Sequence, residues 1–233
     1  MSASRPSPFA NLTPVVKNLL IINIIFFIAT YLLRQTFDME KWLSVYYFNS
    51  PQFRLWQIIT YMFMHGNIGH IFFNMFALFM FGPILEYSIG SQRFFNLYFI
   101  CGLGAIIIQM MVQAFQIHAI TGGIVISHPE LESSYLQFGA SAQKLFDIYN
   151  TPVLGASGAI FGLLVAFGML YPNLEMMILF IPVPIKAKYI IPVYILVELW
   201  LGIGQYGGDN VAHFAHLGGA LFGFIMVKLW RLR

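Results

Sequence analysis

Long apolar stretches separated by polar segments dominate the chain. Six of them, at about 15–33, 66–87, 94–115, 154–171, 187–203 and 211–230, are roughly 17–22 residues long, enough for a helix to cross ~30 Å of hydrocarbon. A further apolar stretch, 174–186, is short and contains Pro182 and Pro184, which favours a hairpin or membrane-surface loop over another span. The pattern therefore predicts an all-α polytopic membrane protein with six transmembrane helices.

The polar segment at 116–152 contains apolar residues at intervals of three and four. These residues are Leu131, Tyr135, Phe138, Ala142, Leu145 and Tyr149. Such spacing gives a helix one apolar face, so we expect an amphipathic helix that lies on the membrane surface. The other long loop, 34–65, is rich in aromatic residues, which favour the lipid headgroup layer.

The composition agrees with a membrane location. Of 233 residues, 59% are hydrophobic and 9% charged, whereas soluble domains usually carry about 25% charged residues. The single cysteine, Cys101, excludes an internal disulfide. The net charge of +3 is explained by Lys and Arg in cytoplasmic loops, so we expect a lipid bilayer as partner and no nucleic acid.

The distribution of basic residues predicts the orientation. Four of the twelve Lys and Arg residues fall on one side: Arg34, Lys41, Arg54 and Lys144. The remaining eight fall on the other side: Arg5, Lys17, Arg93, Lys186, Lys188, Lys228, Arg231 and Arg233. The positive-inside rule then places both termini in the cytoplasm. We expect the membrane to be the plasma (inner) membrane. Residues 1–14 lack a cleavable signal pattern and are expected to be a cytoplasmic N-terminal segment, and 15–233 the six-span domain.

In this orientation, spans two, four and six all begin at the outer face. Near their starts lie several polar residues in the stretches "HGNIGHIFFN", "GASG" and "AHFAHLGG": His65, His70, Asn74, Ser157, His213 and His216. Because the three helices are parallel, these side chains lie at similar depth and can meet. The active site is therefore expected to open to the outer side.

Glycine pairs favour such a meeting. Gly158 and Gly162 on span four, and Gly219 and Gly223 on span six, are small-xxx-small pairs that let helix backbones approach closely in lipid. Ser157 precedes the first pair by one residue. If these two faces pack together, its hydroxyl comes close to an imidazole of span six.

A serine hydroxyl needs a base within hydrogen-bond reach, and acyl transfer needs donors for the oxyanion. His213 and His216 are both candidate bases, while His70, Asn74 and the backbone amide of Ser157 are candidate donors. No carboxylate is close in sequence to either candidate base, which suggests a Ser–His pair without an acid. Each residue also has a purely structural interpretation, since small residues are common at helix contacts.

Glu198 in span five is an intramembrane acid, and such residues are functional candidates by default. It is equally compatible with a paired carboxylate or with one that lies near water. The sequence gives it no catalytic role.

The three motifs together resemble those of the rhomboid family of intramembrane serine proteases. "GASG", with Gly155 and Gly158, resembles GxSG, and "AHLGGALFG" resembles AHxxGxxxG. "HGNIGHIFFN" resembles HxxxxHxxxN. The resemblance covers about 56–228. One departure is Trp56-Gln57, where many relatives carry Trp-Arg, which puts a structural role for that arginine in doubt.

The resemblance implies a role for each matching residue. Ser157 would be the nucleophile, His216 the base, and His70 and Asn74 would line the oxyanion hole. The ring of Phe161 would pack on the catalytic histidine, and Gly219 and Gly223 would be packing glycines.

The implied activity is that of an intramembrane serine endopeptidase that cleaves transmembrane protein substrates without a metal or other cofactor. Three alternatives stay open: an inactive relative that binds client helices, a metalloenzyme, and a channel or transporter. The metalloenzyme would use His65, His70, His213 and His216, but their spacing lacks the HExxH pattern. The transporter lacks broken spans at matching positions of two halves.

Overall fold

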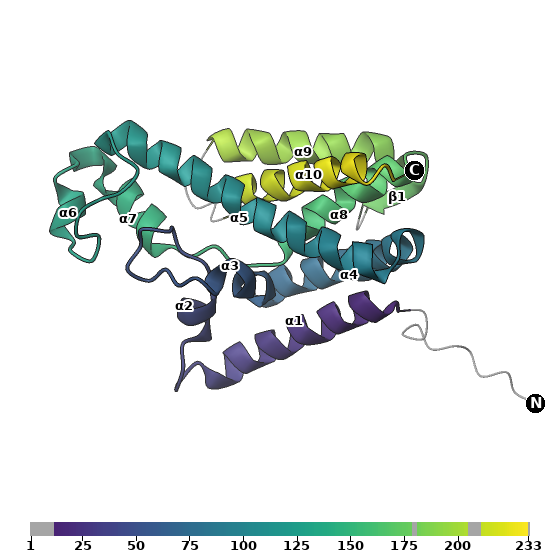
Figure 1. Ribbon diagram of the computed structural model, residues 1–233, viewed down its shortest axis with the longest axis horizontal. Helices are drawn as coiled ribbons and strands as arrows, with labels where there is room; N and C mark the ends of the chain where they lie inside the picture. The colour runs from purple at the N-terminus through teal and green to yellow at the C-terminus, as the bar shows by residue number, and fades with distance from the viewer. Residues whose placement is uncertain (1–11, 179–180, 205–210, 233) are drawn as a thin grey trace, which may run out of the picture.

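Six apolar helices dominate the computed structural model, which describes residues 12–178, 181–204 and 211–232. Within these residues they are α1 (Pro14–Leu33), α4 (Ile68–Ile89), α5 (Ser91–Thr121), α8 (Ser157–Leu170), α9 (Ala187–Gly204) and α10 (His213–Leu229). Figure 1 shows them in one bundle, with α1 on one flank and α9 on the other. The predicted all-α polytopic architecture is confirmed. Most of the predicted segment 1–14 lies outside the described residues.

The helices differ in length more than the apolar stretches predict. α1, α4, α5 and α9 are long and apolar enough to cross a membrane, whereas α8 has 14 residues and α10 has 17. The prediction for 154–171 starts too early, because the backbone before Ser157 pairs with the first loop and does not turn into helix. The prediction for 94–115 ends too early, because α5 runs for 31 residues until Gly122 caps it with a φ of 76°.

The two long loops carry the short helices. The first loop contains α2 (Met39–Leu43), α3 (Gln57–Thr60) and the 3₁₀ turn η2 (Tyr61–Phe63). The second contains α6 (Ser133–Leu136), the 3₁₀ turn η3 (Gly139–Ser141) and α7 (Ala142–Asn150). The amphipathic segment predicted there is thus divided between α6 and α7.

The apolar face of that segment packs inside the protein. Tyr135, Leu145 and Tyr149 are buried in a cluster with Tyr47 of the first loop and Ile117 of α5. Ile117 lies in the extra turns of α5, beyond the end of the predicted shorter span. The cluster therefore joins the two loops to the end of α5. The apolar face that was expected to contact the membrane surface packs against protein instead.

A β-hairpin connects α8 to α9, as the sequence predicts for 174–186. Strand β1 (Glu175–Ile178) pairs antiparallel with β2 (Ile181–Lys186), and Glu175 lies opposite Lys186. The hairpin adds a small two-stranded element to an otherwise helical fold.

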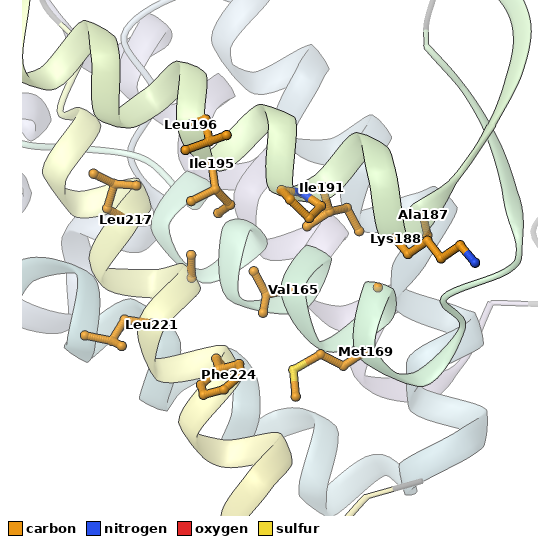
Figure 2. Close-up of a pocket in the computed structure, with 13 residues that line it drawn as sticks. Val165, Met169, Ala187, Lys188, Ile191, Ile195, Leu196, Leu217, Leu221 and Phe224 are labelled. Atoms are coloured by element: carbon orange, nitrogen blue, oxygen red, sulfur yellow. The ribbon is translucent and has the colours of Figure 1, made fainter.

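α9 contacts the bundle along a narrow stripe only. Its buried residues are Ala187, Ile191, Glu198 and Gly202. An apolar groove of about 590 Å³ lies between α9, α8 and α10. Figure 2 shows side chains of all three helices around it, and neither Ser157 nor His216 lines it.

The two ends of the bundle are unlike each other. In Figure 1 the start of α1 and the end of α10 lie at one end, and the loops that carry α2, α3, α6 and α7 lie at the opposite end. Helices α4, α8 and α10 each begin at the end that carries these loops. This arrangement brings the polar residues of their first turns together.

Candidate active site

Ser157 is the first residue of α8 and is held there by the backbone of the preceding segment. Val153 pairs with Val45 of the first loop, and the amide of Gly155 donates to the carbonyl of Tyr61 at 2.9 Å. Amide groups in the first turn of a helix have no intrahelical acceptor, and the helix dipole is positive at this end. Ser157 therefore lies where backbone donors can bind a developing negative charge.

His216 is the partner of Ser157. Its Nε2 atom lies 2.8 Å from the Ser157 hydroxyl oxygen, although the two residues are 59 positions apart. The imidazole also stacks on the ring of Phe161, with centroids 4.3 Å apart and planes 9° apart. Of the two candidate bases, His216 is the one in hydrogen-bond contact with the serine, whereas Nδ1 of His213 faces Glu198.

Glycines bring α8 and α10 into backbone contact. A Cβ atom at Gly219 would overlap the carbonyl oxygen of Gly158, and one at Gly223 would overlap that of Gly162. The two small-xxx-small pairs therefore face each other. This close approach lets the short serine side chain reach the imidazole, because any larger residue at the crossing would separate the helices.

His70 and Asn74 lie on α4 beside the same region. At Gly155, φ is 124°, and a Cβ there would lie 2.6 Å from Nε2 of His70 and 3.6 Å from the Ser157 hydroxyl oxygen. The position that a side chain of residue 155 would occupy is therefore close to both His70 and Ser157, and glycine leaves it open. Asn74 is 6% exposed and donates from Nδ2 to the carbonyl of His70 at 2.9 Å. The sequence-predicted site residues therefore gather around the start of α8.

His65 precedes α4, and its ring packs edge-on against His70 with centroids 5.0 Å apart. Burial lowers its pKa to about 3, and the neighbouring His70 contributes to the same shift. His65 is therefore neutral at neutral pH and adds no charge beside His70.

Glu198 of α9 is a site residue to which the sequence analysis assigns no catalytic role. Its Oε2 atom lies 2.8 Å from Nδ1 of His216 and 2.7 Å from Nδ1 of His213. All three side chains are buried. The only hint in the sequence was an acid within an apolar span, since Glu198 is 18 positions from His216 and the helix packing alone brings them together.

The same three residues form the one set with metal-ligand geometry among the residues that the structure describes. Their ligand atoms lie within 4.8 Å of one another. His65 and His70 are outside this set, so the four-histidine site considered from the sequence does not assemble in the described part of the chain. The two Nδ1 atoms already face a carboxylate oxygen, which makes an ordinary hydrogen-bonded network the simpler arrangement.

Gln57 explains how the first loop is held without the Trp-Arg pair. It is fully buried, and its side-chain oxygen accepts from the amide of Arg54 at 2.9 Å. Its side-chain amide donates to the carbonyl of Gln52 at 3.1 Å. The neighbouring Trp56 donates to the carbonyl of Trp42 at 3.0 Å. The uncharged side chain of Gln57 thus holds together the loop whose Tyr61 carbonyl binds Gly155.

Comparison with known proteins shows what this chain is similar to. A family model described as the Rhomboid domain matches residues 52–128 and 130–232. RHOMBOID-like protein 12, mitochondrial, of Arabidopsis thaliana is 29% identical over 88% of this chain and 55% of its own length. Rhomboid protein 1, mitochondrial, of Saccharomyces cerevisiae is 28% identical over 72% of this chain and 40% of its own length.

A bacterial relative is also similar. Rhomboid protease GluP of Bacillus subtilis is 30% identical over 72% of this chain and 25% of its own length. The chain therefore spans about half, or less, of the length of these relatives. Since the family model covers most of the chain, this protein belongs to the rhomboid family.

Proposed function

We propose that this protein is an intramembrane serine endopeptidase that cleaves transmembrane or membrane-proximal segments of membrane proteins. The observation that carries the proposal is the 2.8 Å contact between Ser157 and His216, two residues on separate helices. Family membership supports the same activity, and one relative is named a protease.

The first half of the reaction forms an acyl-enzyme. The Ser157 oxygen attacks the carbonyl carbon of the scissile peptide bond while Nε2 of His216 takes the hydroxyl proton. The carbonyl oxygen becomes an oxyanion that accepts hydrogen bonds from the Ser157 amide, His70 and Asn74. His216 then gives its proton to the leaving amine as the C–N bond breaks.

The second half releases the acyl group. Water enters the place of the leaving amine, His216 takes one of its protons, and the resulting hydroxide attacks the acyl carbon. When the second oxyanion collapses, the ester bond to Ser157 breaks and His216 returns the proton to the serine oxygen. Besides the substrate and one water molecule, these steps use side chains and backbone groups of this protein.

The length of α8 supports a site below the membrane surface. Its 14 residues span about 21 Å at 1.5 Å per residue, less than the ~30 Å of hydrocarbon. The extended segment before Ser157 completes the crossing, so Ser157 lies within the bilayer. A site at that depth acts on peptide bonds of membrane-embedded segments.

The orientation belongs to the same proposal. In Figure 1 the start of α1 and the end of α10 lie at the same end of the bundle. This is the end to which the sequence assigns eight of the twelve Lys and Arg residues, and by the positive-inside rule we assign it to the cytoplasm. The active site then opens to the opposite face. A plasma (inner) membrane location rests on the sequence alone, since several relatives carry "mitochondrial" in their names.

The test is labelling by a fluorophosphonate probe together with cleavage of a single-span reporter by purified protein. Wild type is expected to label and cleave, and Ser157→Ala to do neither. Ser157→Ala and His216→Ala are each expected to lower kcat by roughly 10⁴–10⁶-fold, as when a serine-protease nucleophile or base is removed. His213→Ala is expected to keep more activity than His216→Ala, because Nε2 of His216 lies 2.8 Å from the Ser157 oxygen, whereas Nδ1 of His213 contacts Glu198.

Two other outcomes would change the conclusion. A folded wild type that neither labels nor cleaves, but retains single-span proteins, would support a client-binding relative. Cleavage that EDTA abolishes and zinc restores would support a metalloenzyme at Glu198, His213 and His216. Unchanged cleavage in EDTA is the expected result.

A further inference from the structure

A buried carboxylate contacts the base on the side opposite the nucleophile. Glu198 is 5% exposed, and its Oε2 atom lies 2.8 Å from Nδ1 of His216. Nε2 of the same ring lies 2.8 Å from the Ser157 oxygen. The imidazole is therefore held at both nitrogens, between a hydroxyl and a carboxylate.

This contact selects the tautomer of His216. An ionised carboxylate only accepts hydrogen bonds, so the hydrogen of the neutral imidazole must be on Nδ1. Nε2 is then unprotonated and can accept the Ser157 proton. Without the carboxylate, both tautomers are accessible, and the one with hydrogen on Nε2 cannot act as a base.

The contact also stabilises the ring after proton transfer. When His216 takes the serine proton it becomes an imidazolium cation in a site where little water screens charge. The carboxylate 2.8 Å away attracts this cation. The stacked Phe161 ring sets the plane of the imidazole, and Glu198 sets its rotation within that plane.

We propose that Glu198 is a positioning residue for the reaction, which extends the Ser157–His216 pair to a Ser–His–Glu arrangement. The proposal rests on the protease function argued above. His213 contacts the same carboxylate oxygen at 2.7 Å from the preceding turn of α10. Glu198 thus acts through His216 and does not touch the substrate.

The competing explanation is a structural clamp. Glu198 is on α9 while both histidines are on α10, so the two hydrogen bonds also join the helices. A clamp would contribute to folding stability, and its loss would reduce all activities in proportion to the folded fraction. A positioning residue would instead change kcat per folded molecule.

The experiment compares Glu198→Gln, Glu198→Asp and His213→Ala with wild type for kcat, KM, rate of fluorophosphonate labelling and Tm. The glutamine amide can donate to Nδ1 and so favours the wrong tautomer. We expect Glu198→Gln to lower kcat by about 10²–10⁴-fold, the upper end being the loss seen in a serine protease whose triad carboxylate becomes an amide. KM should change little. Glu198→Asp, which keeps the charge, should recover part of the lost kcat.

His213→Ala is the matched control for the clamp. It removes the His213–Glu198 bond between α9 and α10 but leaves the Glu198–His216 contact in place, so kcat per folded molecule should fall by less than it does in Glu198→Gln. If His213→Ala and Glu198→Gln lose activity equally and in step with Tm, Glu198 is a clamp and the proposal is overturned.

The two proposals can fail separately. A wild type that labels at Ser157, together with a Glu198→Gln variant of unchanged kcat, would overturn the role of Glu198 and leave the protease function intact. A wild type that neither labels nor cleaves would overturn both.

Discussion

Asn74 shows at the scale of one residue how a buried amide can serve two purposes. One of its two amide hydrogens binds the carbonyl of His70 in its own helix, which fixes the side-chain rotamer. In the proposed mechanism the other would donate to the oxyanion that forms at Ser157. Because Asn74 is 6% exposed, a hydrogen bond to a developing charge there competes little with bulk water.

We predict that Asn74→Ala lowers kcat and kcat/KM together, by roughly 10²–10³-fold, as for the loss of one oxyanion-hole donor. Labelling by a small activated probe should weaken less than peptide cleavage, because the hydroxyl and its base are unchanged. The measurement is kcat, KM and Tm in a single detergent.

Asn23 provides the matched control. It is buried in α1 and donates to the carbonyl four residues earlier, Leu19, at 2.7 Å, as Asn74 does in α4. Asn23→Ala therefore removes the same kind of bond far from Ser157 and should change Tm without changing kcat per folded molecule. If Asn74→Ala behaves in the same way, Asn74 is not a catalytic donor.

At the scale of the helix, the site depends on how closely α8 approaches α10. Carbonyl oxygens of α8 face the glycines of α10, and Cys101 and Ala105 of α5 lie against the glycines of α8. α5 thus contacts α8 through small side chains, whereas α8 and α10 meet backbone to backbone. Such a crossing tolerates no added atom, because the neighbouring atoms are backbone and cannot rotate away.

We predict that Gly219→Ala lowers the free energy of unfolding by about 1–3 kcal/mol or more, the usual cost of an added methyl group in a packed core. Cleavage should fall further than stability, because the added methyl would separate Ser157 from His216. Thermal melts and cleavage assays in the same detergent measure both effects.

Gly123→Ala is the corresponding control for Gly219→Ala. A Cβ at Gly123 would meet its nearest atom, the carbonyl oxygen of Val125, at 3.7 Å, which is an ordinary contact. It should leave both Tm and activity unchanged. If Gly219→Ala also leaves Tm and cleavage unchanged, the α8–α10 crossing accommodates the added methyl group and the prediction is wrong.

Particular helices show what the sequence could and could not predict. α1, α4 and α9 agree with their apolar stretches within about two residues, because apolar length alone specifies a span. The start of α8 was placed too early, because strand-like pairing of Val153 with Val45 depends on a loop more than 100 positions away. Apolar length carries no information about such a partner.

The candidate site divides in the same way. Ser157, His216, His70 and Asn74 could be found from motifs whose spacing is local. The contact of Glu198 with His216 could not, because it depends on the angle at which α9 crosses α10. Likewise, the hydrogen bonds of the buried Gln57 come from loop residues that no periodic pattern relates.

At the scale of the whole molecule, the orientation in the membrane can be tested with single cysteines. The native Cys101 is buried and should contribute little background. We predict that Glu40→Cys and Glu132→Cys react with an impermeant thiol reagent added to the non-cytoplasmic side, since both positions are exposed in the long loops. Gln92→Cys, in the first turn of α5, should react only after permeabilisation.

Gln92 is preferable to the adjacent Gly90 for this purpose. Gly90 has a φ of 82°, so a cysteine there would strain the turn, whereas Gln92 is exposed within the first turn of α5. The opposite labelling pattern would place the site on the cytoplasmic face and contradict the positive-inside assignment.

The weak attachment of α9 has a consequence for the order of events in a catalytic cycle. α9 is bordered by an apolar groove, yet it carries the carboxylate that holds His216. A hydrogen bond of 2.8 Å is lost after a shift of about 1 Å. Any sideways displacement of α9 that admits a substrate helix would therefore also release the base. Substrate entry and hydrolysis would then alternate, and a peptide bond would be cleaved only after α9 has returned to its place beside α10.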